Sequence, residues 1–184
     1  MKKFLVLSVL CSLIACSSSS ATKEDKPEEQ QPKNVYRNPV IDYSLPDPSV
    51  IEGDDGYYYL YATEDIRNLP IHRSKNLVDW EYVGTAFTDR TRPDFEPNGG
   101  LWAPDINKIG DKYVLYYSMS VWGGELTCGI GCATADKPEG PFTDHGKMFR
   151  SNEINVQNSI DRKNDAPTDR CPAFRRHTPS ATSY

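Results

Sequence analysis

Asp47 is the residue whose setting most favours chemistry, because it lies between Pro46 and Pro48. Each proline ring holds its own φ near about −65° and biases the preceding residue toward extended geometry, so the backbone around Asp47 has few alternatives. Its carboxylate is therefore aimed in one direction, where it can accept a proton or a hydrogen bond. For these residues by themselves, a surface Pro-Asp-Pro turn without any chemistry is the alternative.

A hairpin is predicted to position Asp47. The turn residues 53–56 lead into residues 57–61, a run of four tyrosines and a leucine. Aromatic residues prefer strands, and a turn rich in Gly and Asp between two such runs favours an antiparallel hairpin. Asp47 is thus expected just before the first strand of a hairpin.

The aromatic run returns about 55 residues later, at residues 113–118. Each copy follows a turn that contains Gly and Asp, and each has a Pro-and-Asp element further upstream. Two more strands are predicted after each run, at residues 71–74, 80–83, 131–134 and 141–144. A repeat of four strands is typical of a propeller blade. Residues 34–161 are therefore predicted to be all-β, with two blades and the start of a third at Asp161.

The N-terminal residues 1–15 have the features of a bacterial lipoprotein signal peptide. Two lysines precede an apolar stretch too short to cross a bilayer, and residues 13–16 match a lipobox. We expect an exported lipoprotein of the outer membrane, cell surface or periplasm, anchored through acylated Cys16. An ordinary signal peptide is the alternative. Residues 16–33 are polar and contain no aromatic residue, so they are predicted to be a disordered tether.

Charge and composition separate the last part of the chain from the rest. The net charge is −5, and no basic stripe with interleaved aromatic residues precedes Arg162, so nucleic acid is not an expected partner. From Arg162 the strand pattern stops. Residues 162–184 are predicted to be an aberrant or disordered tail from premature termination or an out-of-frame reading, with a basic interaction tail as the alternative.

Six segments in order resemble glycoside hydrolase family 43. The resemblance implies the N-terminal two blades, plus the start of a third, of a five-bladed β-propeller that is incomplete in this chain. It also implies hydrolysis of α-L-arabinofuranosides or β-D-xylosides with inversion. The matching segments are residues 38–40, 46–50, 76–80, 101–105, 135–142 and 158–161.

Inverting hydrolysis needs a general base and a general acid about 6.5–9.5 Å apart, which leaves room for a water. The resemblance gives Asp47 the role of general base and Asp161 the role of tuning the pKa of the acid. The acid, a glutamate of a later blade, has no matching position here. Arg162 and Lys163 also stand where the family has a proline and an aromatic strand. The remaining candidates are predicted to be solvated surface side chains, namely Glu64, Glu96, Glu125 and Glu153.

Trp102 and Asp105 match a segment that lines the pocket of the family. The resemblance implies an aromatic platform and a hydroxyl partner for a sugar, whereas a place for Trp102 in the core between blades is the alternative. No metal or cofactor is expected, although some relatives hold calcium on the propeller axis through a histidine of a late blade. His72 and His145 are predicted at strand edges or turns, without a catalytic role.

Cys128 and Cys132 are predicted on one face of a strand. Four residues of strand separate their backbones by roughly 13 Å, beyond the limit of about 7 Å for a disulfide. Both are therefore predicted to be buried thiols, and Cys171 falls in the tail.

Three functions are compatible with these observations. The first is an exported hydrolase of plant-cell-wall arabinan or arabinoxylan, with arabinan favoured, of which this chain is a truncated and inactive form. Its partner would be an arabinose- or xylose-containing polysaccharide or oligosaccharide. The second is a surface lipoprotein that binds glycans without cleaving them. The third is a fragment without function, since two blades leave open sheet edges.

Overall fold

The computed structural model describes residues 36–160 and 171–174 of the 184-residue chain. Its helical elements are short, α1 (Ser151–Ile154) and the 3-10 helix η2 (Pro172–Phe174). None of the helices in these two ranges has the length and hydropathy needed to cross a membrane. The strands are β1 (Ser49–Glu52), β2 (Tyr58–Tyr61), β3 (Pro70–Ser74), β4 (Glu81–Thr85), β5 (Gly100–Ile109), β6 (Lys112–Ser120), β7 (Gly129–Ala135) and β8 (Thr143–Arg150).

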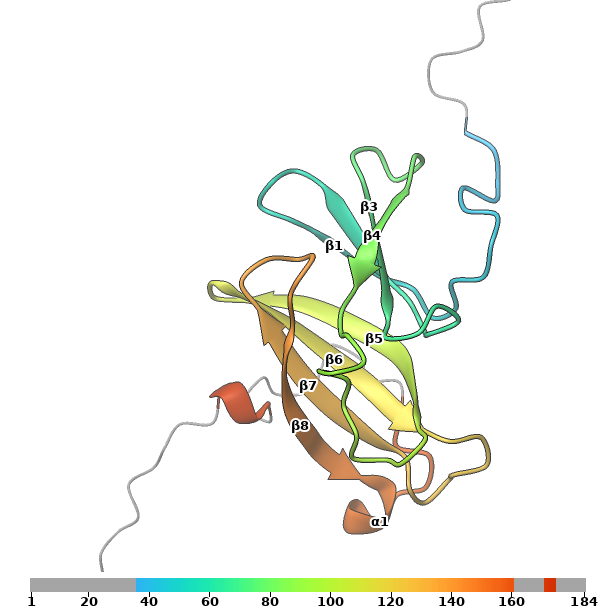
Figure 1. The fold of residues 1–184 in the computed structure, drawn as a ribbon, viewed down its shortest axis with the longest axis vertical. Coiled ribbons are helices and arrows are strands. Elements are labelled where there is room, and N and C mark those ends of the chain that lie inside the picture. The colour runs from blue at the N-terminus through green and yellow to red at the C-terminus, as the bar shows by residue number, and fades with distance from the viewer. Residues whose placement is uncertain (1–35, 161–170, 175–184) are drawn as a thin grey trace, which may run out of the picture. The chain divides into compact units, whose positions relative to one another are not determined.

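The strands form two four-stranded antiparallel sheets, ordered β1-β2-β3-β4 and β5-β6-β7-β8 (Figure 1). Each strand pairs with the next one in the sequence, as in the blades of a propeller. The two aromatic runs found in the sequence are β2 and β6, the second strand of each sheet. The all-β fold of two propeller blades is thereby confirmed.

The predicted hairpin before the first aromatic run is also confirmed. β1 and β2 pair from Ser49↔Tyr61 to Glu52↔Tyr58. The turn is closed by the Gly53 N–H, which donates to the carbonyl oxygen of Tyr57 at 2.8 Å. Gly56 has a φ of 75°, a value that costs a glycine little. This turn sets the register that puts Tyr59 and Tyr61 on the buried face.

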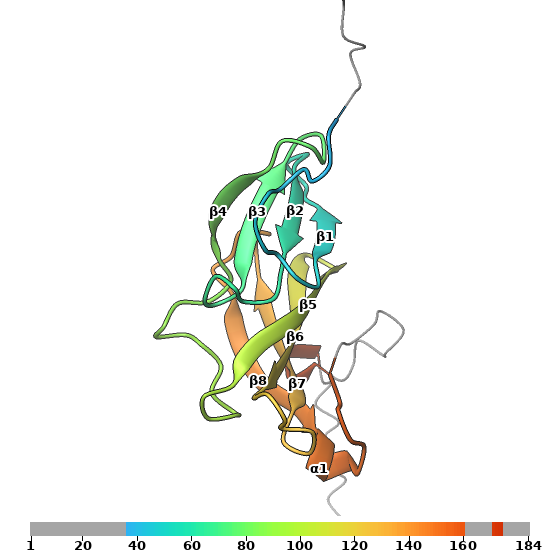
Figure 2. The ribbon, with the colours of Figure 1, turned by 90° about the vertical axis from the view of Figure 1, so that its right-hand side faces the viewer.

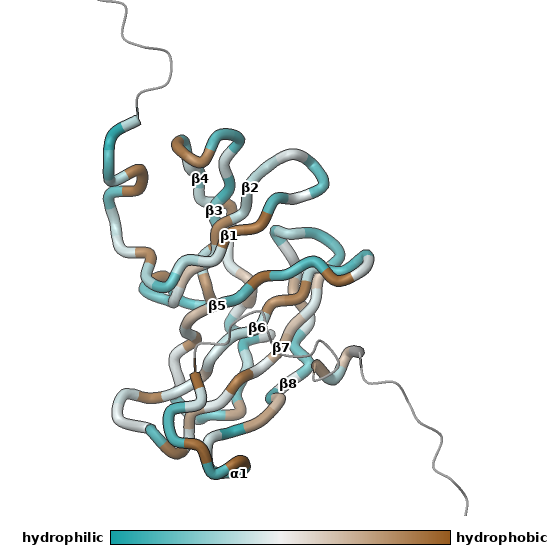
Figure 3. The backbone as a smooth tube through the Cα atoms, turned by 180° about the vertical axis from the view of Figure 1, so that it is seen from behind, coloured by the Kyte–Doolittle hydropathy of each residue, from teal (hydrophilic) through white to brown (hydrophobic). Residues whose placement is uncertain are grey.

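One aromatic core joins the two sheets. Tyr61 of β2 meets Phe142 edge to face with ring centroids 6.1 Å apart, and Phe87 meets Tyr117 of β6 in the same way at 5.5 Å. All four side chains belong to a single buried cluster. β5 contacts β1 and β2, and it lies on the side of the second sheet that faces the first (Figure 2). Figure 3 shows the apolar stretches on strands of both sheets.

His72 is fully buried in the middle of β3, so its predicted place at a strand edge is wrong. Its Nε2 lies 2.5 Å from the hydroxyl of Tyr43, and its ring meets Tyr82 at 5.3 Å. Burial lowers the pKa of His72. The His72 ring thus packs between two tyrosines in the interior of the first sheet. His145 lies in β8 and hydrogen-bonds to Thr134 at 2.7 Å.

Cys132 of β7 forms a disulfide with Cys171, so its prediction as a free thiol is wrong. The two Cα atoms are 5.9 Å apart. Cys171 is fully buried beside Val114 and Tyr116, and it brings η2 into contact with β8. Cys128 is a buried free thiol, as predicted. Sequence spacing could exclude a bond between Cys128 and Cys132, but it could not reveal a partner 39 residues away.

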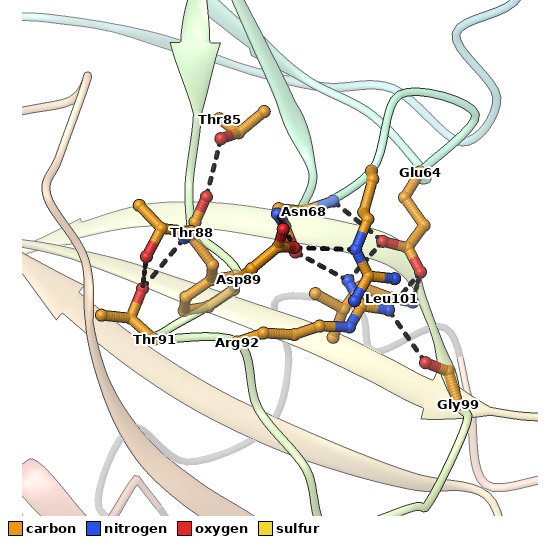
Figure 4. Close-up of polar contacts among 11 residues, drawn as sticks. Glu64, Asn68, Thr85, Thr88, Asp89, Thr91, Arg92, Gly99 and Leu101 are labelled. Carbon is orange, nitrogen blue, oxygen red and sulfur yellow. Dashed lines mark hydrogen bonds and ion pairs between the residues drawn. The ribbon is translucent and has the colours of Figure 1, made fainter.

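A buried ion pair fixes the connection between the sheets at the end of β2 (Figure 4). Arg92 holds the Glu64 carboxylate with both terminal nitrogens, at 2.6 Å to Oε2 and 2.5 Å to Oε1. The two side chains are only 11% and 10% exposed. The same carboxylate accepts the N–H groups of Asn68 at 2.9 Å and Leu101 at 2.8 Å. Arg92 also donates to the carbonyl oxygen of Gly99 at 2.9 Å.

Glu64 is therefore not a solvated surface side chain, and neither is Glu96. Glu96 is buried and pairs with Arg150, whose guanidinium also donates to the carbonyl oxygens of Phe95 and Thr127. Burial by itself raises the pKa of Glu64. The hydrogen bonds from Arg92 and from two backbone N–H groups outweigh burial, so the pKa lies below its ordinary value. The other two glutamates, Glu125 and Glu153, are exposed as predicted.

Replacing Arg92 with methionine should lower the free energy of unfolding by about 3 kcal/mol, because the Glu64 carboxylate would stay buried without a counter-ion. Urea unfolding measures this change. Arg67→Met is the matched control, since the Arg67–Asp89 pair is 63% and 74% exposed and its loss should change the free energy of unfolding far less. The stabilisation by ionised Glu64 should be lost as the pH falls through its lowered pKa. Equal losses in the two variants would contradict a buried ion pair.

Replacing Cys171 with serine should cost about 3 kcal/mol, because the closed loop no longer restricts the unfolded chain. Urea unfolding with and without a reductant tests this expectation. Reductant should destabilise the wild type and leave Cys171→Ser unchanged. A wild type with the same midpoint under both conditions would show that the disulfide does not stabilise the fold.

Candidate functional site

Asp47 lies just before β1 with its side chain exposed. Its φ is 49°, in the left-handed region, so the extended geometry predicted from Pro48 is wrong. Aspartate tolerates this region better than most residues, and the conformation persists where surrounding contacts hold it. One such contact is the N–H of Thr63, which donates to the carbonyl oxygen of Pro46 at 2.9 Å.

Thr63 connects Asp47 to the second sheet. Its hydroxyl donates to Oδ2 of Asp47 at 2.7 Å and accepts the N–H of Ala103 at 2.8 Å. Ser49 makes a second connection, since its hydroxyl oxygen accepts the N–H of Ile106 at 3.2 Å. The Pro-Asp-Pro-Ser segment is thus held between the end of β2 and the middle of β5.

The Ala103 N–H that donates to Thr63 lies in a bulge of β5. The pairing of β5 with β6 shifts between Trp102 and Asp105, which leaves Ala103 and Pro104 outside the regular ladder. Proline lacks an N–H and is tolerated in strands at bulges and edges. Ala103 has a φ of 40°, the second left-handed residue that precedes a proline at this site. Bulges of this kind re-aim groups next to active sites.

Two tryptophans lie together beside the bulge. The half-buried ring of Trp102 lies 5.4 Å from that of Trp122, which is 94% exposed. A methyl group on Gly100 would come within 2.4 Å of Trp102 Nε1, so the ring lies directly over this glycine. Asp105 is half-buried on β5. Trp122 was not predicted, although a tryptophan followed by Gly-Gly just after an aromatic strand is a usable signal for an exposed loop.

The remaining site predictions lie outside the described residues. Asp161 falls in the range 161–170, and Cys16 falls in the range 1–35. Within residues 36–160 and 171–174, no three histidine, cysteine, aspartate or glutamate side chains gather as a metal site would require. The described site thus consists of Asp47, its partner Thr63, and the tryptophan pair.

Comparison with known proteins shows which enzymes this chain is similar to. A probable arabinan endo-1,5-alpha-L-arabinosidase A of Aspergillus flavus is 32% identical over 120 residues, which are 64% of this chain and 37% of the relative. A non-reducing end alpha-L-arabinofuranosidase of Bacteroides ovatus is 33% identical over 120 residues, 61% of this chain and 22% of the relative. The chain therefore spans well under half the length of these relatives.

Solved structures of arabinanases are also similar to this chain. The arabinanase of Bacillus subtilis matches with a TM-score of 0.57 and 31% identity, over 65% of this chain and 43% of that one. The alpha-L-arabinanase of Cellvibrio cellulosa in complex with arabinohexaose matches with a TM-score of 0.56 and 29% identity, over 65% and 40%. The model of glycosyl hydrolases family 43 matches residues 36–164, which is more than half of the sequence. The chain belongs to glycosyl hydrolase family 43.

Proposed function

We propose that this chain supplies the base and part of the sugar platform of an arabinan-degrading glycoside hydrolase, with Asp47 as the general base. The hydrogen bond from Thr63 to Asp47 is the observation that carries the proposal. It leaves an exposed carboxylate held in one orientation beside the junction of the two sheets. Relatives named for action on arabinan support arabinose-containing polymers as the substrate class.

In an inverting mechanism, Asp47 would take a proton from the water that attacks the anomeric carbon. A carboxylic acid on the other side of the sugar would protonate the leaving oxygen. Glu64 and Glu96 are unsuited to that role because each is buried and paired with an arginine. Asp161 would tune the pKa of the acid, as the resemblance implies. The acid itself has no candidate among the residues that the structure describes.

The tryptophan pair suits a sugar ring. Trp122 is almost fully exposed, and a large apolar ring in water is a favourable surface for the C–H face of a furanose. The ring of Trp102 lies against the ring of Trp122. Trp102 also precedes Ala103, whose N–H donates to the Thr63 hydroxyl. Asp105 would accept hydrogen bonds from sugar hydroxyls. Binding of glycans without cleavage is the second candidate function, and the exposed Trp122 favours it.

A substrate whose leaving group needs no general acid tests the role of Asp47 as general base directly. The dinitrophenolate of a 2,4-dinitrophenyl α-L-arabinofuranoside leaves without protonation, so hydrolysis by the 184-residue chain should depend on Asp47 alone. Asp47→Asn should lower the rate by about 10²-fold or more, and Asp94→Asn, an exposed carboxylate elsewhere, should not. Linear arabinan should remain uncleaved, because its leaving group does need an acid.

Two results would contradict this assignment. Hydrolysis of the activated substrate that persists in Asp47→Asn would remove Asp47 from the base role. Arabinan cleavage by the wild type would show that an acid is present after all. Binding of arabinohexaose without turnover of the activated substrate would favour the glycan-binding function.

We also propose that the chain is exported and anchored through Cys16. The disulfide between Cys132 and Cys171 supports export, because disulfides persist in oxidising compartments. Cys16→Ser should therefore release the protein from the membrane fraction or leave its precursor uncut. Fractionation of a bacterial host followed by mass spectrometry of the N-terminus measures both. A variant that is processed and fractionates like the wild type would contradict the lipid anchor.

A further inference from the structure

We propose that Thr63 is a positioning residue for Asp47 and selects which carboxylate oxygen takes the proton from water. This inference rests on the proposed function of Asp47 as the base. A hydroxyl has a single proton to donate. Because the Thr63 oxygen already accepts the N–H of Ala103, its proton points to Oδ2 of Asp47. Oδ2 is thus engaged, so Oδ1 would be the oxygen that takes the proton from water.

The backbone on both sides of this hydroxyl is fixed, so its direction is fixed too. The N–H of Thr63 donates to Pro46, and the N–H of Glu64 donates to the carbonyl oxygen of Leu101 at 3.2 Å. The Glu64 carboxylate in turn accepts the N–H of Leu101 at 2.8 Å and is gripped by Arg92. Threonine is also stiff about χ1, because two heavy atoms branch from its Cβ. The orientation of Thr63 is therefore set before any substrate arrives.

Two strained residues meet at this hydroxyl. Asp47 and Ala103 have φ values of 49° and 40°, and each precedes a proline. Such conformations persist only where neighbours hold them, and they gather at functional sites. Thr63 is hydrogen-bonded to both.

The test removes the hydroxyl while keeping the shape. Thr63→Val keeps the shape of the side chain but removes the hydroxyl, and Thr63→Ser keeps the hydroxyl. Thr85→Val is the matched control, because it also removes a threonine hydroxyl that donates a hydrogen bond, here to the carbonyl oxygen of Phe87 at 2.7 Å. With 2,4-dinitrophenyl α-L-arabinofuranoside, Thr63→Val should lower kcat about 10-fold to 100-fold with KM unchanged. Thr63→Ser should recover most of this loss, and Thr85→Val should match the wild type.

A measurement on the carboxylate itself separates this inference from the proposed function. Three-bond couplings to the 13Cγ of Asp47 in the isotopically labelled chain report its χ1 angle. The wild type and Thr63→Ser should show one rotamer, and Thr63→Val should show averaged couplings. Should Thr63→Val fail to fold, Thr63→Ala takes its place.

The outcomes are distinct. Couplings and kcat in Thr63→Val equal to those in Thr85→Val would overturn the positioning role. A wild type without turnover, but with couplings that change as expected, would overturn the proposed function of Asp47 and leave Thr63 as the residue that orients it.

Discussion

The Glu64 carboxylate is the group on which this end of the protein depends. It follows β2 of the first sheet, yet three of its four donors come from other segments: two nitrogens of Arg92 in the connection to β5, and the N–H of Leu101 in β5 itself. A buried carboxylate is costly unless its oxygens are satisfied, so these segments must come together for the chain to fold. Glu64 thereby ties the first sheet to the second beside Asp47.

The aromatic core makes further contact between the sheets, and it has a different character. Tyr61, Phe87 and Tyr117 gain stability mainly from burial, which is not directional. The hydroxyls of Tyr61 and Tyr117 add hydrogen bonds to the carbonyl oxygen of Pro138 and to the carboxylate of Asp144. The Glu64–Arg92 pair is directional, because a planar guanidinium meets a carboxylate in one geometry. The core brings the sheets together, and the ion pair sets the position of β5 relative to the end of β2.

Local features of the fold could be predicted from the sequence, and long-range ones could not. Strands β2 and β6 and the 53–56 turn follow from residue types that act on their own neighbours. Glu64 was expected at the surface because its partner Arg92 is distant in sequence, and Cys132 was expected to be a free thiol for the same reason. The φ of Asp47 was missed because tertiary hydrogen bonds overrode the local preference that Pro48 imposes.

One peptide in β5 links the two parts of the candidate site. Trp102 and Ala103 are consecutive residues at the bulge of β5. The Trp102 ring lies against Trp122, whereas the Ala103 N–H donates to the Thr63 hydroxyl. The N–H of Leu101, two residues earlier, also points away from β6 and donates to the Glu64 carboxylate, so this side of β5 faces the end of the first sheet. The tryptophan pair and the hydrogen bonds that orient the Asp47 carboxylate therefore depend on the same segment of backbone.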